Sequence, residues 1–405
     1  MTCLAKLARS RDDDRSHNAG NRIHSGGVRL DKPRPIKYRT AHLICKPLVP
    51  CPSLSTSKSL GVMLDLPTPN VDRSTIAVVT VTYGERKAWL EEMLVATLAQ
   101  GVGRVVVVNN GSPWNVTAFA ARLDAARIAV VDLPANQGSA PGYVKGLEAA
   151  IQAGAEYIWL IDDDNLPGRH CLDALLAAYS ELGRDHDAGK LAVSAYRLDQ
   201  HEAAIPRRGT RLVAFGPSSF LDGFHLFTLH RELWRQSSWQ RSRRRRMLPA
   251  LLTAKVTPYS GLFFHRSLIE HFGLPRSDFV LYADDTEFTY RITANGGQIY
   301  VVPAAVFDDL VPTWNMGRSS RRFDPPILTA GDDLRAYYAT RNLTYFFTYC
   351  NRNSRGIYWL NRHVYMMLLF VIALARRRRS RYRVLRQAMD DGLARRMGVS
   401  QEFPL

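Results

Sequence analysis

The chain has 405 residues, of which 46% are hydrophobic, enough for one large α/β domain with additions or for two domains. Its formal net charge of +17 favours partners that carry negative charge, such as an anionic membrane or an anionic substrate. The five cysteines are scattered without a C-x-x-C pair, which argues against a disulfide framework or a zinc site and favours a reducing cytoplasm.

The N-terminal segment differs from the rest of the chain. Residues 1–72 are rich in Arg, Lys, Ser and Pro and show no sustained hydrophobic period, which predicts a disordered basic segment. The segment also lacks the apolar stretch of a signal peptide. Met63 lies just before the periodic region begins, so the residues upstream of it are expected to be dispensable for folding.

Short apolar runs then alternate with stretches of helical periodicity. Strands are predicted at 76–81, 105–108, 128–133 and 157–161, and helices at about 85–100, 116–126, 142–153 and 168–182. Strands and helices of this length in alternation predict βαβ units and a mainly parallel α/β sheet. Because such sheets bind ligands outside the carboxyl ends of their strands, the polar residues that follow the strands are candidates for a site.

Three acids, Asp162, Asp163 and Asp164, directly follow the apolar run 157–161. Adjacent carboxylates repel one another unless a cation lies among them, and hard oxygen ligands suit Mg²⁺ or Mn²⁺, usually together with substrate phosphates. The alternative is a polar turn after a core strand. Another acidic triplet, at 12–14, lies between arginines with no strand before it and is interpreted as solvated charge.

A second acidic group opens a later helix. Between the two groups the pattern weakens, with strand-like pieces at 191–197 and 212–215, a basic segment at 230–255 and a helix at 266–272. Asp284, Asp285 and Glu287 then begin a helix, and a further strand is expected at 299–302. One or two acids would satisfy the helix dipole, so three acids after a hydrophobic approach favour a catalytic role.

The C-terminal region contains an uninterrupted run of 12 apolar residues, Val364 to Ala375. As a helix this run would span about 18 Å, less than the hydrocarbon core of a bilayer, which is about 30 Å thick. Tyr358 and Trp359 precede the run, and Arg376–Arg379 follow it. The pattern predicts a helix that lies on the surface of an anionic membrane; the alternative is a helix packed on the catalytic domain or on another subunit.

Taken in order, these motifs resemble glycosyltransferase family 2 with the GT-A fold, from about residue 76 to residue 342. The matching segments are Val81-Thr82-Tyr83, Val108–Ser112, Asn136–Gly142, Asp162–Asp164, Asp284–Glu287 and Tyr337–Asn342. The last of these, and Asp391-Gly392-Leu393 in the tail, are similar to bacterial rhamnosyltransferases and galactofuranosyltransferases.

The resemblance implies a GT-A domain at 73–335 and a helical C-terminal extension at 336–405. It also implies an inverting, metal-dependent enzyme that moves a sugar from a UDP- or dTDP-linked donor to a glycan or lipid-linked acceptor. Such an enzyme would act in cell-envelope polysaccharide synthesis, in the cytoplasm at the inner face of the plasma membrane.

The resemblance further implies roles for individual residues. The donor-binding positions are Thr82, Tyr83, Asn109, Asn136, Gly138 and Asp163. The positions for Mn²⁺ or Mg²⁺ are Asp162, Asp164 and Asp308, and the catalytic positions are the base Asp285 with Asp284 and Glu287, which bind the acceptor or orient the base. Asn109 stands where an aspartate is usual, and Asp308 stands near the place where many relatives have a histidine.

Three other functions remain open at this point. A sugar nucleotidyltransferase would use a similar sheet and metal, but residues 82–86 are not the glycine-rich basic loop that normally follows its first strand. A nucleic-acid-binding protein would explain the charge, but the basic runs lack interleaved aromatics, and we expect no nucleic-acid partner. A catalytically inactive, membrane-docked scaffold that binds nucleotide sugars is the third.

Overall fold

The structure is a computed structural model that describes residues 71–197, 210–212, 215–216, 218–221, 223–228, 248–311, 325–351 and 354–405. These residues belong to one unit, Leu64–Leu405. Of the segment predicted to be disordered, only residues 71 and 72 are described, and the arginine run at 243–246 lies outside the described residues. The domain boundaries proposed at 72/73 and 335/336 stay predictions.

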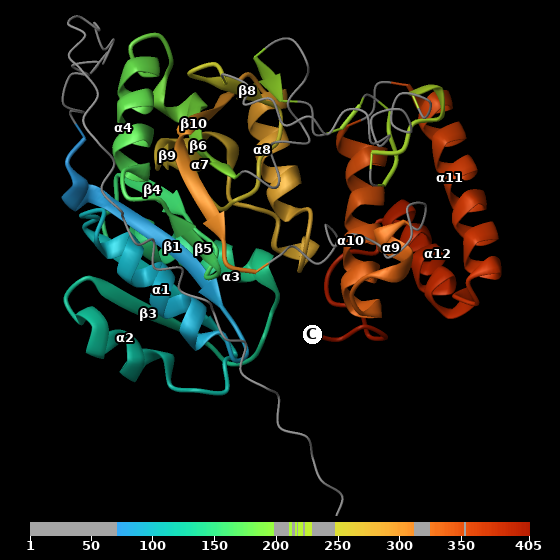
Figure 1. Ribbon diagram of the computed structural model, residues 1–405, viewed down its shortest axis with the longest axis horizontal. Coiled ribbons are helices and arrows are strands. Elements are labelled where there is room, and N and C mark those ends of the chain that lie inside the picture. The colour runs from blue at the N-terminus through green and yellow to red at the C-terminus, as the bar shows by residue number, and fades with distance from the viewer. Residues whose placement is uncertain are drawn as a thin grey trace, which may run out of the picture. The chain divides into compact units, whose positions relative to one another are not determined.

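Within the described residues, ten strands form one mixed, mainly parallel sheet (Figure 1). The strands are β1 (Ile76–Thr82), β2 (Arg104–Asn110), β3 (Ile128–Leu133), β4 (Tyr157–Leu160), β5 (Asn165–Pro167), β6 (Leu191–Arg197), β7 (Arg211–Leu212), β8 (Leu252–Ala254), β9 (Leu262–His265) and β10 (Gln298–Asp309). Their order is β3-β2-β1-β4-β9-β6-β10-β8-β7, and β5 pairs with β10. Strands β1 to β4 run parallel, as the sequence predicted.

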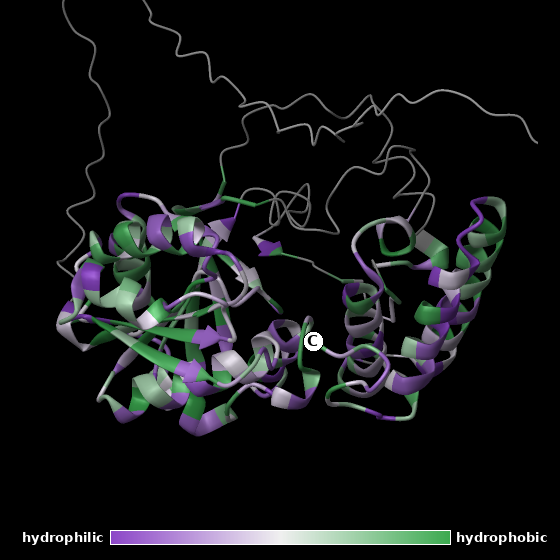
Figure 2. Cartoon of the chain, turned by 90° about the horizontal axis from the view of Figure 1, so that it is seen from below, coloured by the Kyte–Doolittle hydropathy of each residue, from purple (hydrophilic) through white to green (hydrophobic). Residues whose placement is uncertain are grey.

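Helices cover both faces of this sheet (Figure 1). Helices α1 (Lys87–Leu98), α2 (Val116–Asp124) and α4 (Cys171–Leu182) pack on one face, and α3 (Ser139–Gln152), α7 (Ser267–Phe272) and α8 (Asp284–Ala294) on the other. Strand β1 shows why both faces are buried, because Ile76 and Val78 contact the first layer while Ala77 and Val79 contact the second. The strands in Figure 2 are accordingly mainly hydrophobic.

Several strands, including β5, differ from the sequence prediction. Strand β9 was not predicted, although it lies at the centre of the sheet, antiparallel to both β4 and β6. Its run of three apolar residues, Leu262–Phe264, shows no alternation and carries no distinct strand signal. Strand β8 lies inside the segment predicted to be unpatterned. Strand β10 extends to Asp309, well beyond the predicted 299–302, because a register shift between Val302 and Val306 lets pairing continue.

The C-terminal extension is helical, as predicted. It contains α9 (Pro326–Thr329), α10 (Asp333–Tyr345) with a π-helical turn at Phe346–Cys350, α11 (Arg355–Ala375) and α12 (Arg379–Leu393). Helices α10 and α12 cross closely at Gly392, where a Cβ atom would lie 2.4 Å from the Arg341 carbonyl oxygen. Buried Arg381 of α12 also donates to the carbonyl oxygens of Ala330 and Gly331, just before α10. The helices therefore form one packed group.

Candidate active site

The first acidic group lies where the sequence placed it, directly after β4 at the carboxyl end of the parallel strands. Tyr143, which projects from α3, donates a hydrogen bond of 2.5 Å from its hydroxyl to Asp162 Oδ1. The backbone N–H of Asp162 donates to Ser260 Oγ. Strand β1 lies beside β4, so Thr82 at its end is at the same edge of the sheet. Tyr143 therefore holds Asp162 at its carboxylate, and Ser260 holds it at its backbone.

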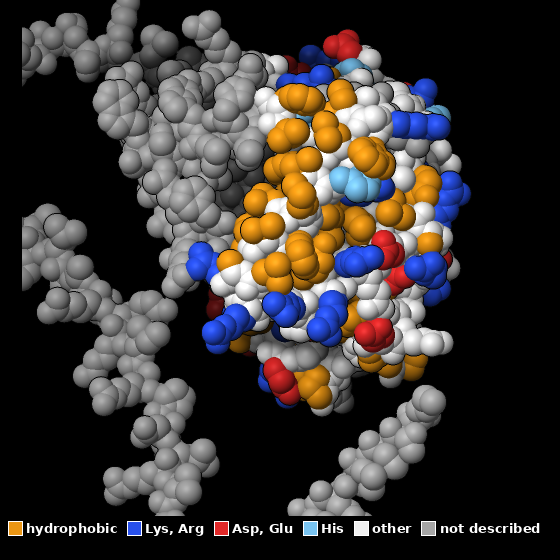
Figure 3. All heavy atoms as spheres, turned by 90° about the vertical axis from the view of Figure 1, so that its right-hand side faces the viewer, with side chains coloured by type: hydrophobic (Ala, Val, Ile, Leu, Met, Phe, Trp, Pro, Cys, Tyr) orange, Lys and Arg blue, Asp and Glu red, His pale blue; other side chains and the backbone are white. Residues whose placement is uncertain are grey.

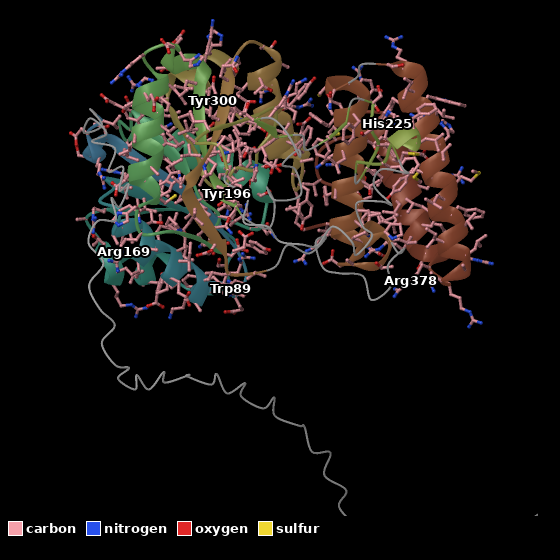
Figure 4. All side chains as sticks on the ribbon, turned by 45° about the horizontal axis from the view of Figure 1, so that its top comes forward. Trp89, Arg169, Tyr196, His225, Tyr300 and Arg378 are labelled. Atoms are coloured by element: carbon pink, nitrogen blue, oxygen red, sulfur yellow. The ribbon has the colours of Figure 1, made fainter. Side chains whose placement is uncertain are left out.

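Arg86 forms ion pairs with the other two acids of this group. Its guanidinium lies 2.9 Å (Nε) and 2.8 Å (Nη2) from the two Asp163 oxygens, and its Nη2 lies 2.5 Å from Asp164 Oδ2. The guanidinium also lies 4.9 Å from the ring centres of Tyr83 and Trp89, the latter labelled in Figure 4. The sequence reasoning missed Arg86. Its signal was its place just before α1, a few residues after the end of β1.

Two acids of the first group, Asp162 and Asp163, are hard to ionise in this environment. Burial raises the pKa of Asp163 to about 7, although the nearby Arg86 charge opposes that shift. Burial also raises the pKa of Asp162, and the Asp164 charge adds to the effect while Arg197 opposes it. Carboxylates with raised pKa values gain more than ordinary ones from an added cation. The group is therefore suited to binding positive charge.

The second acidic group opens α8 and adjoins the first. Asp284 is buried, and within the described residues its Oδ2 atom accepts no hydrogen bond. Asp285 Oδ1 accepts hydrogen bonds from the backbone N–H and the hydroxyl of Thr286, at 2.6 and 3.2 Å. Burial raises the pKa of Asp285 to about 6, and the Asp162 charge contributes to that rise. Two groups more than a hundred residues apart in sequence thus act on each other electrostatically.

The loop before α8 has an unusual backbone. Val280, Tyr282 and Ala283 have φ angles of 67°, 67° and 60°, a left-handed region that costs non-glycine residues roughly 1–3 kcal/mol each. Burial also raises the pKa of Asp284 well above its usual range. A strained loop followed by buried, unsatisfied carboxyls is therefore stable only if other parts of the chain hold it in place.

Helix α10 holds this loop. Asn342 Nδ2 lies 2.8 Å from each of three carbonyl oxygens, those of Phe279, Leu281 and Tyr282. Its neighbour Arg341 is almost fully buried and donates to Phe279 O at 3.2 Å. The sequence singled out the segment Tyr337–Asn342 without assigning it a role. The structure shows that two of its residues bind the backbone that precedes the second acidic group.

The expected nucleoside-binding side differs in detail from the prediction. Asn109 on β2 donates from Nδ2 to Asp132 Oδ1 at 2.7 Å, and Asp132 is its neighbour on β3. The exposed Asp132 carboxylate therefore lies beside the position where an aspartate was expected. Asn136 accepts hydrogen bonds through Oδ1 from buried Asn110 Nδ2 and from the Gly138 N–H, both at 3.0 Å. Its carboxamide oxygen thus closes the turn before α3.

Gly138 is explained by a contact within the protein. Its φ angle is +92°, and a Cβ atom there would lie 2.1 Å from the Val280 carbonyl oxygen. The same oxygen accepts a hydrogen bond from the N–H of Ala140 at 3.1 Å. A Cβ on Gly142 would lie 2.7 Å from Val81 Cγ1. Packing against the strained loop and against β1 explains why neither position has a side chain, and the donor contact implied for Gly138 stays a prediction.

Asp308 and its neighbour Asp309 lie in different surroundings, and the metal role predicted for Asp308 stays a prediction. Asp308 is exposed on β10, whereas the next residue, Asp309, accepts hydrogen bonds of 2.7 Å from Asn165 Nδ2 and from Arg197 Nη2. Arg197 Nη1 in turn lies 3.8 Å from Asp162 Oδ2. Because side chains alternate along a strand, continuation of β10 through Asp309 turns the two carboxylates to opposite faces. The carboxylate that the structure connects to Asp162 is thus Asp309.

Glu287 also has a different partner from the one expected. Its carboxylate pairs with Arg291, one turn further along α8, with 3.0 Å between Oε1 and Arg291 Nε. Arg291 Nη2 donates to the carbonyl oxygen of Leu274 at 3.0 Å. Glu287 therefore links α8 to the segment that follows α7, and the proposed contact with the acceptor stays a prediction.

The donor set fits a cation that arrives with substrate. Within the described part of the chain, no group of three or more His, Cys, Asp or Glu side chains is arranged to hold a metal ion. Mg²⁺ typically takes one or two carboxylates from a protein and its other ligands from water and substrate phosphates. Asp162 and Asp164 match that smaller requirement, provided that Arg86 gives up Asp164.

Comparison with known families bears on the assignment of this domain. Residues 77–254 match the sequence profile of the family described as "Glycosyl transferase family 2". This segment is a family 2 glycosyltransferase domain. The matched residues include β1 to β8 and the first acidic group, and the mixed, mainly parallel sheet with flanking helices is GT-A-like. The predicted family and fold class are therefore confirmed.

Solved structures resemble the glycosyltransferase domain only distantly. One is described as "Crystal structure of GalNAc-T7 with UDP, GalNAc and Mn2+", with 12% identity and a TM-score of 0.41, covering 67% of this chain and 47% of that one. Another is TarS of S. aureus, with 17% identity and a TM-score of 0.38, covering 69% of this chain and 44% of that one. The chain thus spans less than half the length of either. Among curated proteins, none matches the chain.

Proposed function

We propose that this chain catalyses the inverting transfer of a sugar from a nucleotide-diphosphate donor to a hydroxyl group of a glycan or lipid-linked acceptor. The observation that carries the proposal is the meeting of Asp162–Asp164 with Asp284 and Asp285 at the carboxyl end of the sheet in a family 2 glycosyltransferase domain. A displacement of this kind needs one group to neutralise the leaving diphosphate and another to take the acceptor proton.

The first acidic group would serve the leaving diphosphate. Asp162 and Asp164 would hold Mn²⁺ or Mg²⁺ together with phosphate oxygens, and the bound cation supplies Lewis-acid stabilisation of the developing negative charge. Arg86 pairs with Asp164 in the structure. The proposal therefore requires Arg86 to exchange that carboxylate for a phosphate oxygen, so that it remains beside the diphosphate as a second positive charge.

The second group would serve the acceptor. The acceptor oxygen attacks the anomeric carbon from the face opposite the diphosphate, whose bond to that carbon breaks with both electrons leaving on the diphosphate. The hydroxyl proton passes to Asp285, whose pKa of about 6 leaves it ionised at pH 7 yet more basic than an ordinary carboxylate. Burial raises the pKa of Asp284 well above its usual range, which favours the protonated form that can donate a hydrogen bond to the acceptor.

The donor would bind through residues at the ends of β1 to β3. Tyr83 is exposed, and the pair Asn109 and Asp132 presents both an amide and a carboxylate beside it in the sheet edge. We propose that Asp132 supplies the contact that the resemblance expected from the position of Asn109. Rhamnosyl or galactofuranosyl transfer from UDP- or dTDP-linked donors, in cell-envelope polysaccharide synthesis, is proposed from the C-terminal motifs alone.

The decisive experiment is a screen of nucleotide sugars for slow hydrolysis in the absence of an acceptor. One donor should release its nucleoside diphosphate only when Mn²⁺ or Mg²⁺ is present, and the variant Asp162→Ala should abolish that release. Nucleotide binding without turnover on any acceptor would favour a catalytically inactive scaffold instead. Release of pyrophosphate from a nucleoside triphosphate would favour a sugar nucleotidyltransferase.

A further inference from the structure

Helix α11 carries a hydrophobic stripe that no described residue covers. Its exposed large apolar side chains retain between 37% and 62% of their accessible surface: Ile357, Trp359, Met367, Leu368, Phe370, Val371 and Leu374. Positions 359, 363, 367, 371 and 374 are spaced by three or four residues and so share one face of the helix. Figure 3 shows these side chains gathered on one face of the molecule, with arginines along the border. Contiguous exposed apolar surface of this kind marks an interaction site.

The opposite face of α11 is anchored to the protein. Its buried residues are Tyr358, Asn361, Tyr365, Met366, Leu369 and Ala373. Asn361 is fully buried, donates from Nδ2 to Ser218 O at 2.9 Å and accepts at Oδ1 from the Leu226 N–H at 3.0 Å. Withdrawing the helix would leave these backbone groups without partners, which is costly in a bilayer. Helix α11 therefore has one face that is bound to the protein and one apolar face that is exposed.

Positive charge borders the hydrophobic stripe. Arg377, Arg378 and Arg379 are exposed at the turn between α11 and α12, where Figure 4 labels Arg378. The sequence contains no Asp or Glu between Asp333 and Asp390. A surface that joins an apolar stripe to a cluster of exposed arginines matches the anionic head groups and acyl boundary of a membrane.

We infer that the exposed face of α11, with the arginines at 377–379, docks flat on the surface of an anionic lipid bilayer. By length and composition α11, with 21 residues and a hydropathy of 1.5, could cross a membrane. Its uninterrupted apolar run covers only 12 of these residues. The helix is longer than that run because it begins at Arg355. If α11 lies in the plane of the membrane surface, its buried face stays bonded to the protein. Trp359 then lies at the membrane–water interface, which tryptophan prefers.

A second copy of this chain is the competing occupant of the stripe. In a two-fold dimer the same patch meets itself, so both copies would bring their arginines to one interface. Like charges brought together in this way oppose association. An anionic bilayer meets both the apolar and the basic part of the surface. Docking of α11 on an anionic bilayer does not require that the chain transfers a sugar.

Vesicle flotation of the full chain tests this inference. Binding should appear with phosphatidylcholine vesicles that contain phosphatidylglycerol, and should weaken in high salt. Replacing Arg377, Arg378 and Arg379 with Gln should lower partitioning on the order of a hundredfold, about fivefold for each arginine. The double variant Met367→Glu/Val371→Glu should abolish binding. Hydrolysis of a nucleotide sugar without vesicles should be unchanged in both variants.

Matched controls lie on the sheet domain. Replacing Arg104, Arg169 and Arg184 with Gln removes the same charge from exposed positions elsewhere. Val95→Glu changes a valine of α1 that is 55% exposed, close to the 56% of Val371. These controls should bind vesicles like the unchanged chain. Equal loss of binding in the controls would show a general charge effect and overturn the assignment to α11.

Two further outcomes would also overturn the inference. One is recovery of the unchanged chain in the soluble fraction with anionic vesicles. The other is a concentration-dependent dimer, seen in analytical ultracentrifugation, in a chain that does not bind vesicles. If Met367→Glu/Val371→Glu abolishes that dimer, the stripe serves self-association. Vesicle binding without hydrolysis of any donor would leave the docking inference standing and reject the proposed transferase activity.

Discussion

The hydrogen bonds from Asn342 to the loop before α8 lead to a prediction about catalysis. Asn342→Leu removes the donor that lies 2.8 Å from three carbonyl oxygens while keeping a similar volume. The Asn342 NH2 group has two hydrogens to share among the three oxygens, so at roughly 0.5–1.5 kcal/mol of net stabilisation for each bond the loss is about 1–3 kcal/mol. The three left-handed residues of the loop each store strain of roughly 1–3 kcal/mol, so the released loop should relax toward ordinary backbone angles.

Relaxation of that loop would displace Asp285 but not the first acidic group. Misplacement of a catalytic group by about 1 Å costs on the order of 10²-fold in rate. We therefore expect kcat to fall by about 10²-fold or more in Asn342→Leu, while the affinity for nucleotide with Mn²⁺ stays near that of the unchanged chain. Turnover of the donor, calorimetry with the nucleotide and urea denaturation measure the three quantities.

Asn361→Leu is the matched control for this experiment. Asn361 is also a fully buried asparagine of the C-terminal extension that bonds to backbone groups, but those groups are Ser218 O and Leu226 N, outside the catalytic loop. This variant should lose stability and keep kcat. If Asn342→Leu retains full kcat, or if both variants lose kcat equally, Asn342 does not position the base and the loss reflects general destabilisation.

The remaining predictions concern the acidic groups and the N-terminus. Asp285→Asn should retain donor binding and lower kcat by at least about 10²-fold; an inactive Asp284→Asn with an active Asp285→Asn would move the base by one residue. Because the pKa of Asp285 is raised to about 6, kcat should fall as pH drops through that value. A carboxyl whose pKa is raised in the folded state destabilises the fold at pH values above its unfolded-state pKa. Without divalent cation, Asp285→Asn should therefore raise the free energy of unfolding at pH 8 by up to about 3 kcal/mol and change it little at pH 4. Denaturation curves at the two pH values measure this difference. Asp162→Ala and Asp164→Ala should each abolish the cation-dependent part of nucleotide binding in calorimetry; unchanged affinity in both would reject the cation site. A chain that starts at Met63 should melt at the same temperature as the full chain, and a drop of several degrees would contradict the predicted disorder.

Much of the fold follows from local sequence patterns. The runs 76–81 and 128–133 and the helices between them match β1, β3, α1 and α2 closely, because hydrophobic periodicity depends on which side of each element is buried. The two acidic groups were found for a similar reason. Carboxylates directly after a buried strand, or crowded in the first turn of a helix, are unusual enough in sequence to be noticed without any knowledge of their partners.

The pairing of residues far apart in the chain could not be predicted in this way. Arg86 meets Asp163 and Asp164, Arg197 reaches Asp309, and Asn342 binds the loop that precedes Asp284. None of these partners has a fixed sequence spacing, since each is brought in by a different element of the sheet or by the C-terminal helices. The position of β9, between β4 and β6, had no local signal either.

The sequence by itself determined the family, the βαβ order and the residue types at the site, since these depend on local periodicity and on chemistry that is visible in short motifs. The tertiary structure decided that Asp309, and not Asp308, is linked to Asp162 through Arg197, because neighbouring side chains of β10 point to opposite faces. The metal-binding role of Asp308 stays a prediction. The tertiary structure also decided that Gly138 serves packing against Val280. The direction in which a side chain points, and its distance from residues of other elements, are set only when the whole sheet and its helices are assembled.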